Sequence, residues 1–240
     1  MSSESDAHVI ERLTGQILPA MGLSATNDTS VDLTTLTGRT VVYAYPRTAE
    51  PGVPSPEGWD ETPGAKGCTP QSCSFRDHAA ELRAVGVDNL FGLSSQTTDY
   101  QKEAAERLHL PFALLSDADH RFKEAMAMPD FEAGGMRLFK RLTMIIDDGK
   151  ITKVFYPVDD PAADAENVLK WGANRDIGSL EGFKYSDAML SQGGTWSLAA
   201  LNEFLTNPKA TVPGTKMAFS GVKKDGDRAH LIAFLQSIGE

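Results

Sequence analysis

The sequence contains two cysteines, Cys68 and Cys73, which lie five residues apart in the segment Gly-Cys-Thr-Pro-Gln-Ser-Cys at 67–73. A helix is predicted directly after the first of them, over 69–84, with Pro70 in its first turn, where a missing backbone N–H costs nothing. A thiol just before a helix is placed to become a thiolate, because the free N–H groups and the helix dipole stabilise a negative sulfur. A second thiol nearby can trap the oxidised form of the first. The pair is therefore the best candidate for reactive residues in the chain.

The positions of the two thiols predict different roles for them. Cys68 stands at the amino-terminal edge of the helix and should attack, whereas Cys73 lies more than a turn inside and should resolve the product. A thiolate that attacks the O–O bond of a peroxide becomes a sulfenic acid, and a nearby thiol condenses with it to a disulfide. This chemistry also needs a cation beside the sulfur, for which arginine is well suited.

Helix geometry limits how this pair can form a disulfide. In an intact helix, Cα atoms five residues apart are separated by roughly 8.6 Å. A disulfide needs Cα atoms closer than about 7 Å. If the two cysteines form a disulfide, the first turns of the helix must therefore unwind, and a reduced helical form should alternate with an oxidised, locally unfolded one.

Composition excludes several classes of partner. The chain has 240 residues, 41% of them hydrophobic, and a formal net charge of −10, which argues against nucleic acid or an anionic membrane as the main partner. The acidity is confined to one part: residues 1–171 carry 16 basic and 26 acidic residues, and residues 172–240 carry 7 of each. The first residues are polar and contain no apolar run typical of a signal peptide or a membrane span, so we expect a cytoplasmic protein.

Residues 1–171 are predicted to form an α/β domain. Strand-like and helix-like segments alternate, and two strands flank Asp148-Gly149, a strong hairpin signal. This order indicates a three-layer domain with a mixed sheet. A long loop rich in proline and glycine, over 46–67, precedes the cysteines. The predicted strands are 39–46, 89–94, 112–116, 142–147 and 151–156, and the predicted helices are 69–84, 100–108, 117–126 and 162–171.

A specific resemblance follows from three segments together. Gly-Cys-Thr-Pro-Gln-Ser-Cys-Ser-Phe-Arg-Asp at 67–77 follows Tyr-Ala-Tyr-Pro at 43–46 and precedes Lys-Arg-Leu-Thr-Met-Ile-Ile-Asp-Asp-Gly-Lys-Ile at 140–151. Over roughly residues 15–171 the chain resembles the peroxiredoxin family, and its cysteines five apart are similar to those of the bacterioferritin-comigratory or peroxiredoxin Q subgroup.

The resemblance implies a thioredoxin-like fold and a thioredoxin-dependent peroxidase that needs no bound cofactor. It implies that Cys68 is the peroxidatic cysteine, Cys73 the resolving cysteine and Arg141 the active-site arginine. The expected partners are hydrogen peroxide or an organic hydroperoxide, a reductant of the thioredoxin or glutaredoxin type, and a second copy of the chain in a homodimer.

One position departs from the family pattern, which has Thr or Ser three residues before the peroxidatic cysteine. Here that residue is Ala65, and Thr62 lies further upstream because Ala65-Lys66-Gly67 is inserted. We therefore leave Thr62 out of the site.

Two other interpretations of the cysteines are weaker. If they were passive buried thiols, the resemblance of the sequence on both sides of them to the family would be unexplained. A zinc site would need more ligands than the two thiols and His78.

The tail, residues 172–240, is predicted to form a second, mostly helical segment. Leucines recur at helical spacing over 198–205, before Pro208, and apolar residues do so over 231–238. The segments 174–189, 195–196, 207–209, 212–219 and 227–234 resemble the carboxyl-terminal two thirds of a class I cytochrome c. The resemblance implies that Met217, in Pro-Gly-Thr-Lys-Met, corresponds to an axial haem ligand.

The other half of a haem site is absent from the sequence. Covalent haem attachment needs Cys-x-x-Cys-His, and the chain contains no such motif. We therefore expect no haem and interpret the tail as a degenerate remnant, in which Met217, Trp196 and Phe219 are core or loop residues. The alternatives are haem held without covalent bonds and a site completed by a histidine of a partner chain.

Three functions remain open from the sequence. The favoured one is a thiol peroxidase that uses Cys68, Arg141 and Cys73. The second is a haem-dependent electron carrier, alone or fused to a peroxidase. The third is a redox sensor that signals through the same disulfide instead of turning over.

Overall fold

The computed structural model describes residues 5–173, 177–178, 184–193, 196 and 198–237. The chain divides between Ala165 and Glu166 into two compact units, each with a core of its own. The helix α6 (Asp164–Ala173) crosses this division. The predicted boundary between residues 171 and 172 falls inside the same helix and stays a prediction.

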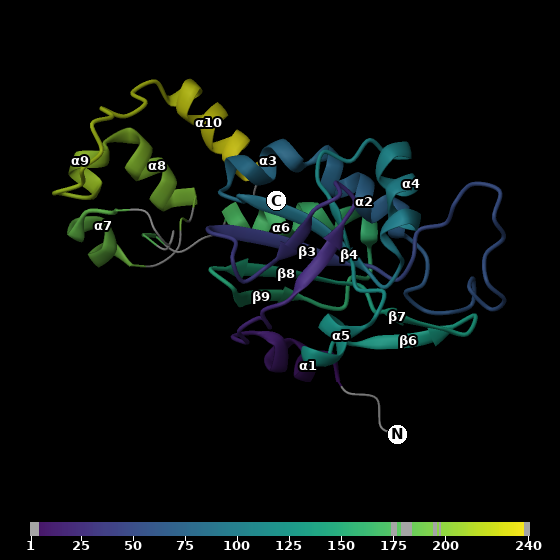
Figure 1. Ribbon diagram of the computed structural model, residues 1–240. Coiled ribbons are helices and arrows are strands. Elements are labelled where there is room, and N and C mark those ends of the chain that lie inside the picture. Colours follow the sequence, from purple (N-terminus) through teal and green to yellow (C-terminus); the bar gives the residue numbers. More distant parts are fainter. Residues whose placement is uncertain (1–4, 174–176, 179–183, 194–195, 197, 238–240) are drawn as a thin grey trace. The chain divides into compact units, whose positions relative to one another are not determined.

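A mixed sheet of seven strands forms the centre of the first unit (Figure 1). Its strand order is β2-β1-β5-β4-β3-β8-β9, in which β3, β4 and β5 run parallel and the other neighbours pair antiparallel. This arrangement confirms the predicted α/β fold with a central mixed sheet. The strands are β1 (Gly22–Ala25), β2 (Ser30–Asp32), β3 (Arg39–Ala44), β4 (Asn89–Ser94), β5 (Leu114–Ser116), β8 (Leu142–Asp147) and β9 (Lys150–Phe155).

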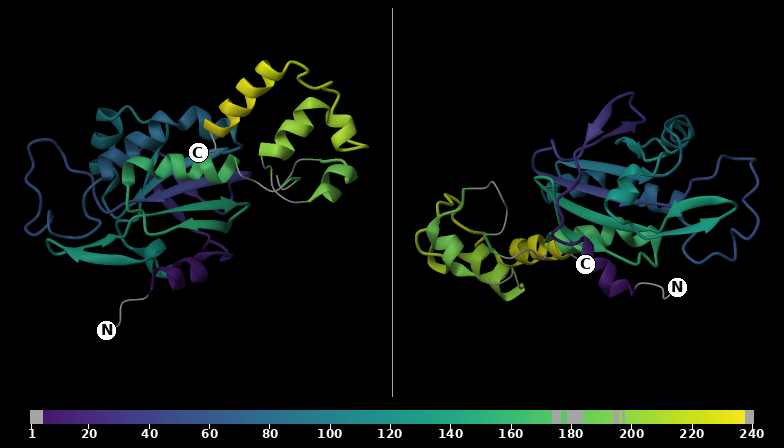
Figure 2. Two further views of the ribbon diagram at one scale, coloured as in Figure 1. Left: turned by 180° about the vertical axis from the view of Figure 1, so that it is seen from behind. Right: turned by 60° about the horizontal axis from the view of Figure 1, so that its bottom comes forward.

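The remaining elements of the first unit lie on or beside this sheet (Figure 2). A separate two-stranded hairpin, β6 (Asp130–Ala133) with β7 (Met136–Phe139), follows α5. The helices are α1 (Asp6–Leu13), α2 (Cys68–Asp77), α3 (Ala79–Ala84), α4 (Thr98–Arg107) and α5 (Arg121–Ala125), with a short 3-10 helix, η1 (Pro161–Ala163), before α6.

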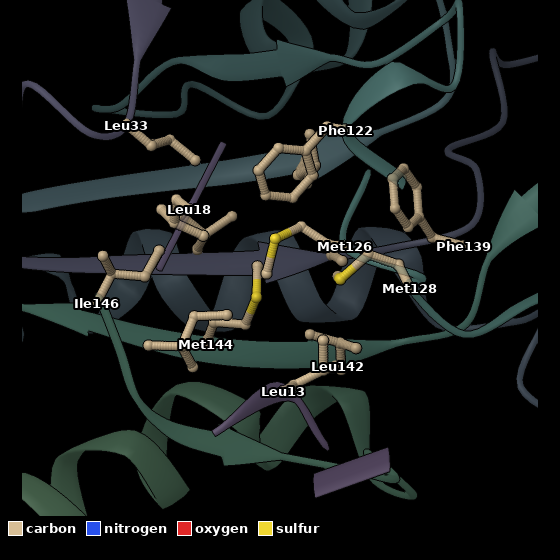
Figure 3. Packing of buried hydrophobic residues seen from close by; sticks show 14 of the residues in the cluster. Leu13, Leu18, Leu33, Phe122, Met126, Met128, Phe139, Leu142, Met144 and Ile146 are labelled. Atoms are coloured by element: carbon tan, nitrogen blue, oxygen red, sulfur yellow. The ribbon is translucent and has the colours of Figure 1, made fainter. Parts of the chain in front are cut away.

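The main core covers one face of the sheet (Figure 3). Because side chains alternate along a strand, Leu142, Met144 and Ile146 of β8 point to this same face. They pack with Leu13 of α1. Met126 and Met128 belong to the same cluster and lie between these side chains and Phe122 (Figure 3). Methionine fills irregular space well because its chain is unbranched and flexible. This core fixes β3 and β8, the two strands that lead to the reactive residues.

The opposite face of the sheet holds the helix that carries the cysteines. Tyr43 of β3 stacks on Phe75 of α2 with ring centroids 4.4 Å apart and an interplanar angle of 7°. The hydroxyl groups of Tyr43 and Ser72 are hydrogen-bonded at 3.1 Å. Burial of both aromatic rings thus fixes α2 against the centre of the sheet.

The long loop before α2 confirms the prediction over 46–67, since no helix or strand forms there. Trp59 and Ala65 of this loop pack with Ala133 and Leu138 of the β6–β7 hairpin in a small apolar cluster. The loop is therefore attached to the body of the unit just before it reaches Cys68.

One local feature differs from the prediction and another confirms it. The helix predicted over 69–84 is two helices, because the chain at His78 leaves helical geometry at φ −99° and ψ 10°. The hairpin at Asp148-Gly149 is confirmed: both residues have positive φ, 48° and 77°, as a turn of type I′ requires.

The second unit is mostly helical, as predicted. A small core contains Ile177, Met189, Phe204 and Val212, and Trp196 packs against it. Met217 and Phe219 lie in a segment without helix or strand and are 41% and 45% exposed. Parts of the predicted cytochrome-like segments, at 174–176, 179–183 and 195, lie outside the described residues. The helices are α7 (Asp187–Gln192), α8 (Leu198–Thr206), α9 (Pro208–Thr211) and α10 (Asp225–Ser237).

Within the part of the chain that the structure describes, none of the helices is both long and apolar enough to cross a membrane.

Candidate active site

Cys68 is the first residue of α2, so its side chain lies at the positive end of that helix. Gly67 caps the helix in the left-handed region, with φ 102°, and its carbonyl accepts a hydrogen bond from the N–H of Gln71. A Cβ atom at Gly67 would stand 2.5 Å from Cγ of Pro161. Only glycine therefore satisfies both the backbone angle and the packing at the position before the cysteine.

Two donors from distant parts of the chain point at the sulfur of Cys68. The backbone N–H of Arg47 donates to Sγ at 3.4 Å, and Nη2 of Arg141 donates to Sγ at 3.5 Å. The thiol itself donates to the carbonyl oxygen of Ala65 at 3.7 Å. Cys68 is only 4% exposed, so little water screens the guanidinium charge from the sulfur.

Arg141 lies at the residue before β8 and is buried. Its Nη2 also donates to the carbonyl oxygens of Lys66, at 2.8 Å, and Gly64, at 3.3 Å, and Nη1 donates to Oε1 of Gln71. The guanidinium group is thus held by the loop before α2 and by the first turn of α2. The structure thus brings Arg141 against Cys68, and its role as the active-site arginine stays a prediction.

Gln71 connects this arginine to a buried carboxyl group. Its Nε2 donates to Oδ2 of Asp164 at 2.7 Å, and the hydroxyl group of Thr143 donates to the same oxygen at 2.7 Å. Burial raises the pKa of Asp164 above its ordinary value, and the hydrogen bonds from Gln71 and Thr143 oppose this shift. A line of hydrogen bonds therefore leads from Asp164 through Gln71 and Arg141 to Cys68.

Cys73 lies on α2 with Cys68, and both thiols are free. Cys68 is buried and Cys73 is partly exposed. Because both belong to one continuous helix, the structure corresponds to the reduced, helical form. The unwinding that a disulfide would require stays a prediction.

Thr62 does not take the place of the missing threonine beside the sulfur. Its hydroxyl group donates to the carbonyl oxygen of Gly58 at 2.7 Å. Ala65 stands three residues before Cys68 and is buried, with only its carbonyl group directed at the sulfur. The donors to Sγ are therefore Arg47 and Arg141.

A cavity of about 390 Å³ lies at the carboxyl ends of the parallel strands. Its lining includes Arg47 after β3, Gln96 after β4, His120 after β5 and Arg137 from the β6–β7 hairpin. Such strand ends are where ligands bind in open α/β sheets. Arg47 joins the cavity to the sulfur, because its N–H faces Cys68 while its side chain lines the cavity and contacts Tyr100.

The model of the Redoxin family matches residues 13–169, which is more than half of the chain. The chain belongs to the redoxin family. All residues that contact the sulfur of Cys68 lie within the matched part of this redoxin.

Solved peroxiredoxin structures share the fold of this redoxin. Peroxidoxin BcpB from Mycobacterium tuberculosis is 26% identical, with a TM-score of 0.51 over 64% of this chain and 91% of that one. Peroxiredoxin Q from Xanthomonas campestris is 20% identical, with a TM-score of 0.53 over 67% of this chain and 96% of that one. The resemblance to the peroxiredoxin Q and bacterioferritin-comigratory subgroup is confirmed.

Curated relatives of a different kind match a shorter part of the chain. Cytochrome c from Stellaria longipes is 56% identical over 62 residues, which are 26% of this chain and 57% of that protein. Cytochrome c2 from Rhodomicrobium vannielii is 60% identical over 58 residues, or 24% and 46%. The chain spans about half the length of these relatives. A cytochrome c-like segment is thus confirmed beside the redoxin domain.

Several residues of the site were not predicted from the sequence. These residues are Arg47, Gln71, Thr143 and Asp164. All except Gln71 reach Cys68 only through the tertiary fold. Two of them left a signal: Gln71 is one turn after Cys68 on the same helix, and Arg47 follows a buried strand ended by Pro46. Asp164, 93 residues from Gln71, left none.

Among the described residues, no three His, Cys, Asp or Glu side chains lie together in a way that could hold a metal ion.

Proposed function

We propose that this redoxin reduces hydrogen peroxide and organic hydroperoxides through Cys68 and is recycled by thioredoxin or a similar dithiol. Membership of the redoxin family and the peroxiredoxin fold support thiol peroxidase activity at the level of the family. The observation that carries the proposal is the convergence of Arg141 and the N–H of Arg47 on the sulfur of Cys68.

The first step is attack of the Cys68 thiolate on one oxygen of the peroxide. The S–O bond forms as the O–O bond breaks, the sulfur is oxidised, and the leaving oxygen takes a proton and departs as water or alcohol. Negative charge moves from sulfur to the two oxygens during this step. Arg141 and the N–H of Arg47 are already fixed beside the sulfur, so they can stabilise this charge without reorganising.

The second step joins the two cysteines. The Cys73 thiol attacks the sulfenic sulfur of Cys68, the S–S bond forms, and the sulfenic oxygen leaves as water after taking a proton. An external dithiol then reduces the disulfide by thiol–disulfide exchange and is itself oxidised to a disulfide. Partial exposure of Cys73 supports this step, because the exchange needs an accessible sulfur.

The cavity beside Arg47 supports organic hydroperoxides as substrates in addition to hydrogen peroxide. Its volume of about 390 Å³ exceeds what hydrogen peroxide needs. Arg137 and Met136 line the same cavity, so it combines charged and apolar surface.

Steady-state peroxide consumption with a thioredoxin system tests the proposal. The wild-type protein should consume peroxide repeatedly, and Cys68→Ser should consume none. Cys73→Ser should be oxidised once and then fail to recycle, with sulfenic acid accumulating. Full turnover by Cys68→Ser would exclude the proposed role of that residue.

The same assay separates the enzyme from a redox sensor. A sensor would be oxidised by one equivalent of peroxide but would not turn over with thioredoxin, glutaredoxin or a small dithiol. Turnover with a small dithiol but not with thioredoxin would support the peroxidase function and exclude thioredoxin as its reductant.

For the tail we propose that no haem is covalently attached. A cavity of about 460 Å³ in the second unit is lined by Met217, Trp196 and Phe204 among others, and none of its described lining residues is cysteine or histidine. Met217 is therefore present without the histidine and the cysteines that covalent attachment requires, and the residues present do not fit a c-type haem. After denaturation and removal of small molecules the protein should show no Soret absorbance, and a Soret band that stays with the denatured chain would contradict the proposal.

A further inference from the structure

Asp164 is separated from the reactive sulfur by two side chains that form one hydrogen-bonded line. Its Oδ2 accepts from Nε2 of Gln71 at 2.7 Å, and Oε1 of Gln71 accepts from Nη1 of Arg141. Nη2 of the same arginine donates to Sγ of Cys68 at 3.5 Å. All four residues are buried, so water cannot take over any of these hydrogen bonds.

The two ends of the Gln71 amide are not equivalent, and its neighbours demand one orientation. A guanidinium group only donates hydrogen bonds, and Oδ2 of Asp164 accepts them. If the amide were turned over, its NH₂ group would face the donors of Arg141 and its oxygen would face the carboxyl oxygens of Asp164. Both hydrogen bonds would then be lost. Asp164 therefore fixes the amide with its oxygen toward the arginine.

The carboxyl group is itself fixed by other elements. Thr143, on β8 two residues after Arg141, donates its hydroxyl group to Oδ2 at 2.7 Å. Asp164 is the first residue of α6 and directly follows η1, which packs against α2. Its position is thus set by the sheet and by the segment beside the cysteine helix, independently of Gln71.

We propose that Asp164 is a positioning residue for the chemistry of Cys68, which acts by holding Gln71 in the orientation that directs Arg141 at the sulfur. This inference rests on the proposed function of the site. Asp164 does not touch the sulfur, and its effect passes entirely through Gln71 and Arg141. A merely structural role would be to anchor the start of α6 to Thr143.

The test uses the alkylation rate of Cys68 by iodoacetamide and its oxidation rate by hydrogen peroxide, in full-length protein with Cys73→Ser so that one thiol remains. Asp164→Ala should lower both rates by about tenfold or more, because Arg141 is no longer directed at the sulfur. Asp164→Asn keeps an oxygen that can accept from Gln71, so its rates should stay within about threefold of the parent.

A second change separates positioning from anchoring. Glutamate at position 71 has two acceptor oxygens and cannot be turned the wrong way, so Gln71→Glu should make Asp164 dispensable for orientation. The double variant Gln71→Glu/Asp164→Ala should therefore recover the rates that Asp164→Ala loses. Its free energy of unfolding should stay low, because the hydrogen bond from Thr143 is still missing.

Asp117 supplies a matched control. It is a fully buried aspartate of the same unit, and it accepts hydrogen bonds from the backbone N–H groups of Phe122 and Lys123 at 2.8 Å each. Asp117→Ala should reduce stability in urea unfolding without changing the reactivity of Cys68.

Two results would overturn the inference: parental rates in folded Asp164→Ala, or no recovery in the double variant. The alkylation rate also separates this inference from the proposed function. Slower alkylation in Asp164→Ala, in a protein whose wild type does not turn over peroxide, would sustain the positioning role and refute the peroxidase.

Discussion

The sulfur of Cys68 faces two kinds of partner, and ionisation changes the effect of one of them. As a thiol it donates to the carbonyl oxygen of Ala65 at 3.7 Å, but a thiolate cannot donate and is repelled by that oxygen. The N–H of Arg47 and the guanidinium group of Arg141 stabilise the thiolate. At this site the arginine therefore carries more of the stabilisation than it would beside a threonine hydroxyl group.

Arg141→Met should slow the reaction of Cys68 with peroxide by about 100-fold or more, as loss of a fixed donor to a developing charge typically does. Stopped-flow oxidation measures this rate. Arg121→Met is the matched control, because Arg121 is an exposed arginine of the same unit, paired with Asp119 at 3.7 Å. Equal oxidation rates in the two variants would show that Arg141 does not contribute to the reaction of Cys68.

The raised pKa of Asp164 predicts that the free energy of unfolding depends on pH. Burial raises its pKa above the ordinary value of 3.8, so the folded protein holds this proton more tightly than the unfolded chain does. The stability that the group contributes is complete below pH 3.8 and is lost as the pH rises through the folded-state pKa. Urea unfolding at several pH values should therefore show wild type losing stability relative to Asp164→Asn from pH 4 upward. A constant difference would contradict the raised pKa.

The sequence analysis named the proposed reactive residues, but not the residues that we propose to orient them. Cys68 and Cys73 stood out through their spacing and their place before a helix, and Arg141 through the family resemblance. Gln71 and Asp164 are separated by 93 residues, and nothing in their local sequence indicates that they are hydrogen-bonded. Such contacts depend on the packing of α2 against η1, which periodicity does not describe.

Among the elements of the fold, α2 is the one that must change in the proposed reaction. It begins at Cys68 and includes Cys73, so the Cα atoms of the two cysteines are roughly 8.6 Å apart by helix geometry. A disulfide requires less than about 7 Å. The stacking of Phe75 on Tyr43 lies beyond Cys73 and can hold the later part of the helix while the first turns open.

Hydrogen exchange measures this change directly. Oxidation to the disulfide should remove protection from the backbone amides in the first turns of α2, because those residues must leave the helix. The amides of α4 serve as an internal control and should exchange equally in both forms. Unchanged protection in α2 after complete oxidation would contradict an intramolecular disulfide between Cys68 and Cys73.

The elements with strong patterns were predicted well, and the short ones were missed. β4 was predicted with the same bounds, over 89–94, because Leu90, Phe91 and Leu93 form a short apolar run between two polar residues. The β6–β7 hairpin was not predicted, because Glu132 and Arg137 interrupt its four-residue strands. The break at His78 also escaped prediction, since Ala and Leu on its far side continue the helical pattern.

In the whole molecule, the proposed thiol chemistry uses one of the two units. Among the described residues, those hydrogen-bonded to the sulfur of Cys68, and those of the line through Gln71 to Asp164, lie before Glu166. The cytochrome c-like segment contributes none of these described contacts. Its own cavity, beside Met217, is built from residues of the second unit.

A chain that ends at Ala173 should therefore keep the peroxide reactivity of Cys68. This end point retains all of α6, whose first residue is Asp164. The rate of oxidation by hydrogen peroxide should be within about twofold of the full chain, because the described contacts of the Cys68 sulfur are all retained. A folded truncated protein with a much slower Cys68 would place part of the site in the tail.

In the proposed reaction, peroxide oxidises Cys68 first and Cys73 then closes a disulfide. Mass spectrometry after addition of one equivalent of hydrogen peroxide tests this order of events. Wild type should lose two hydrogens through a Cys68–Cys73 disulfide, Cys73→Ser should gain one oxygen on Cys68, and Cys68→Ser should remain unmodified. Oxidation of Cys73 in Cys68→Ser at the wild-type rate would contradict the account.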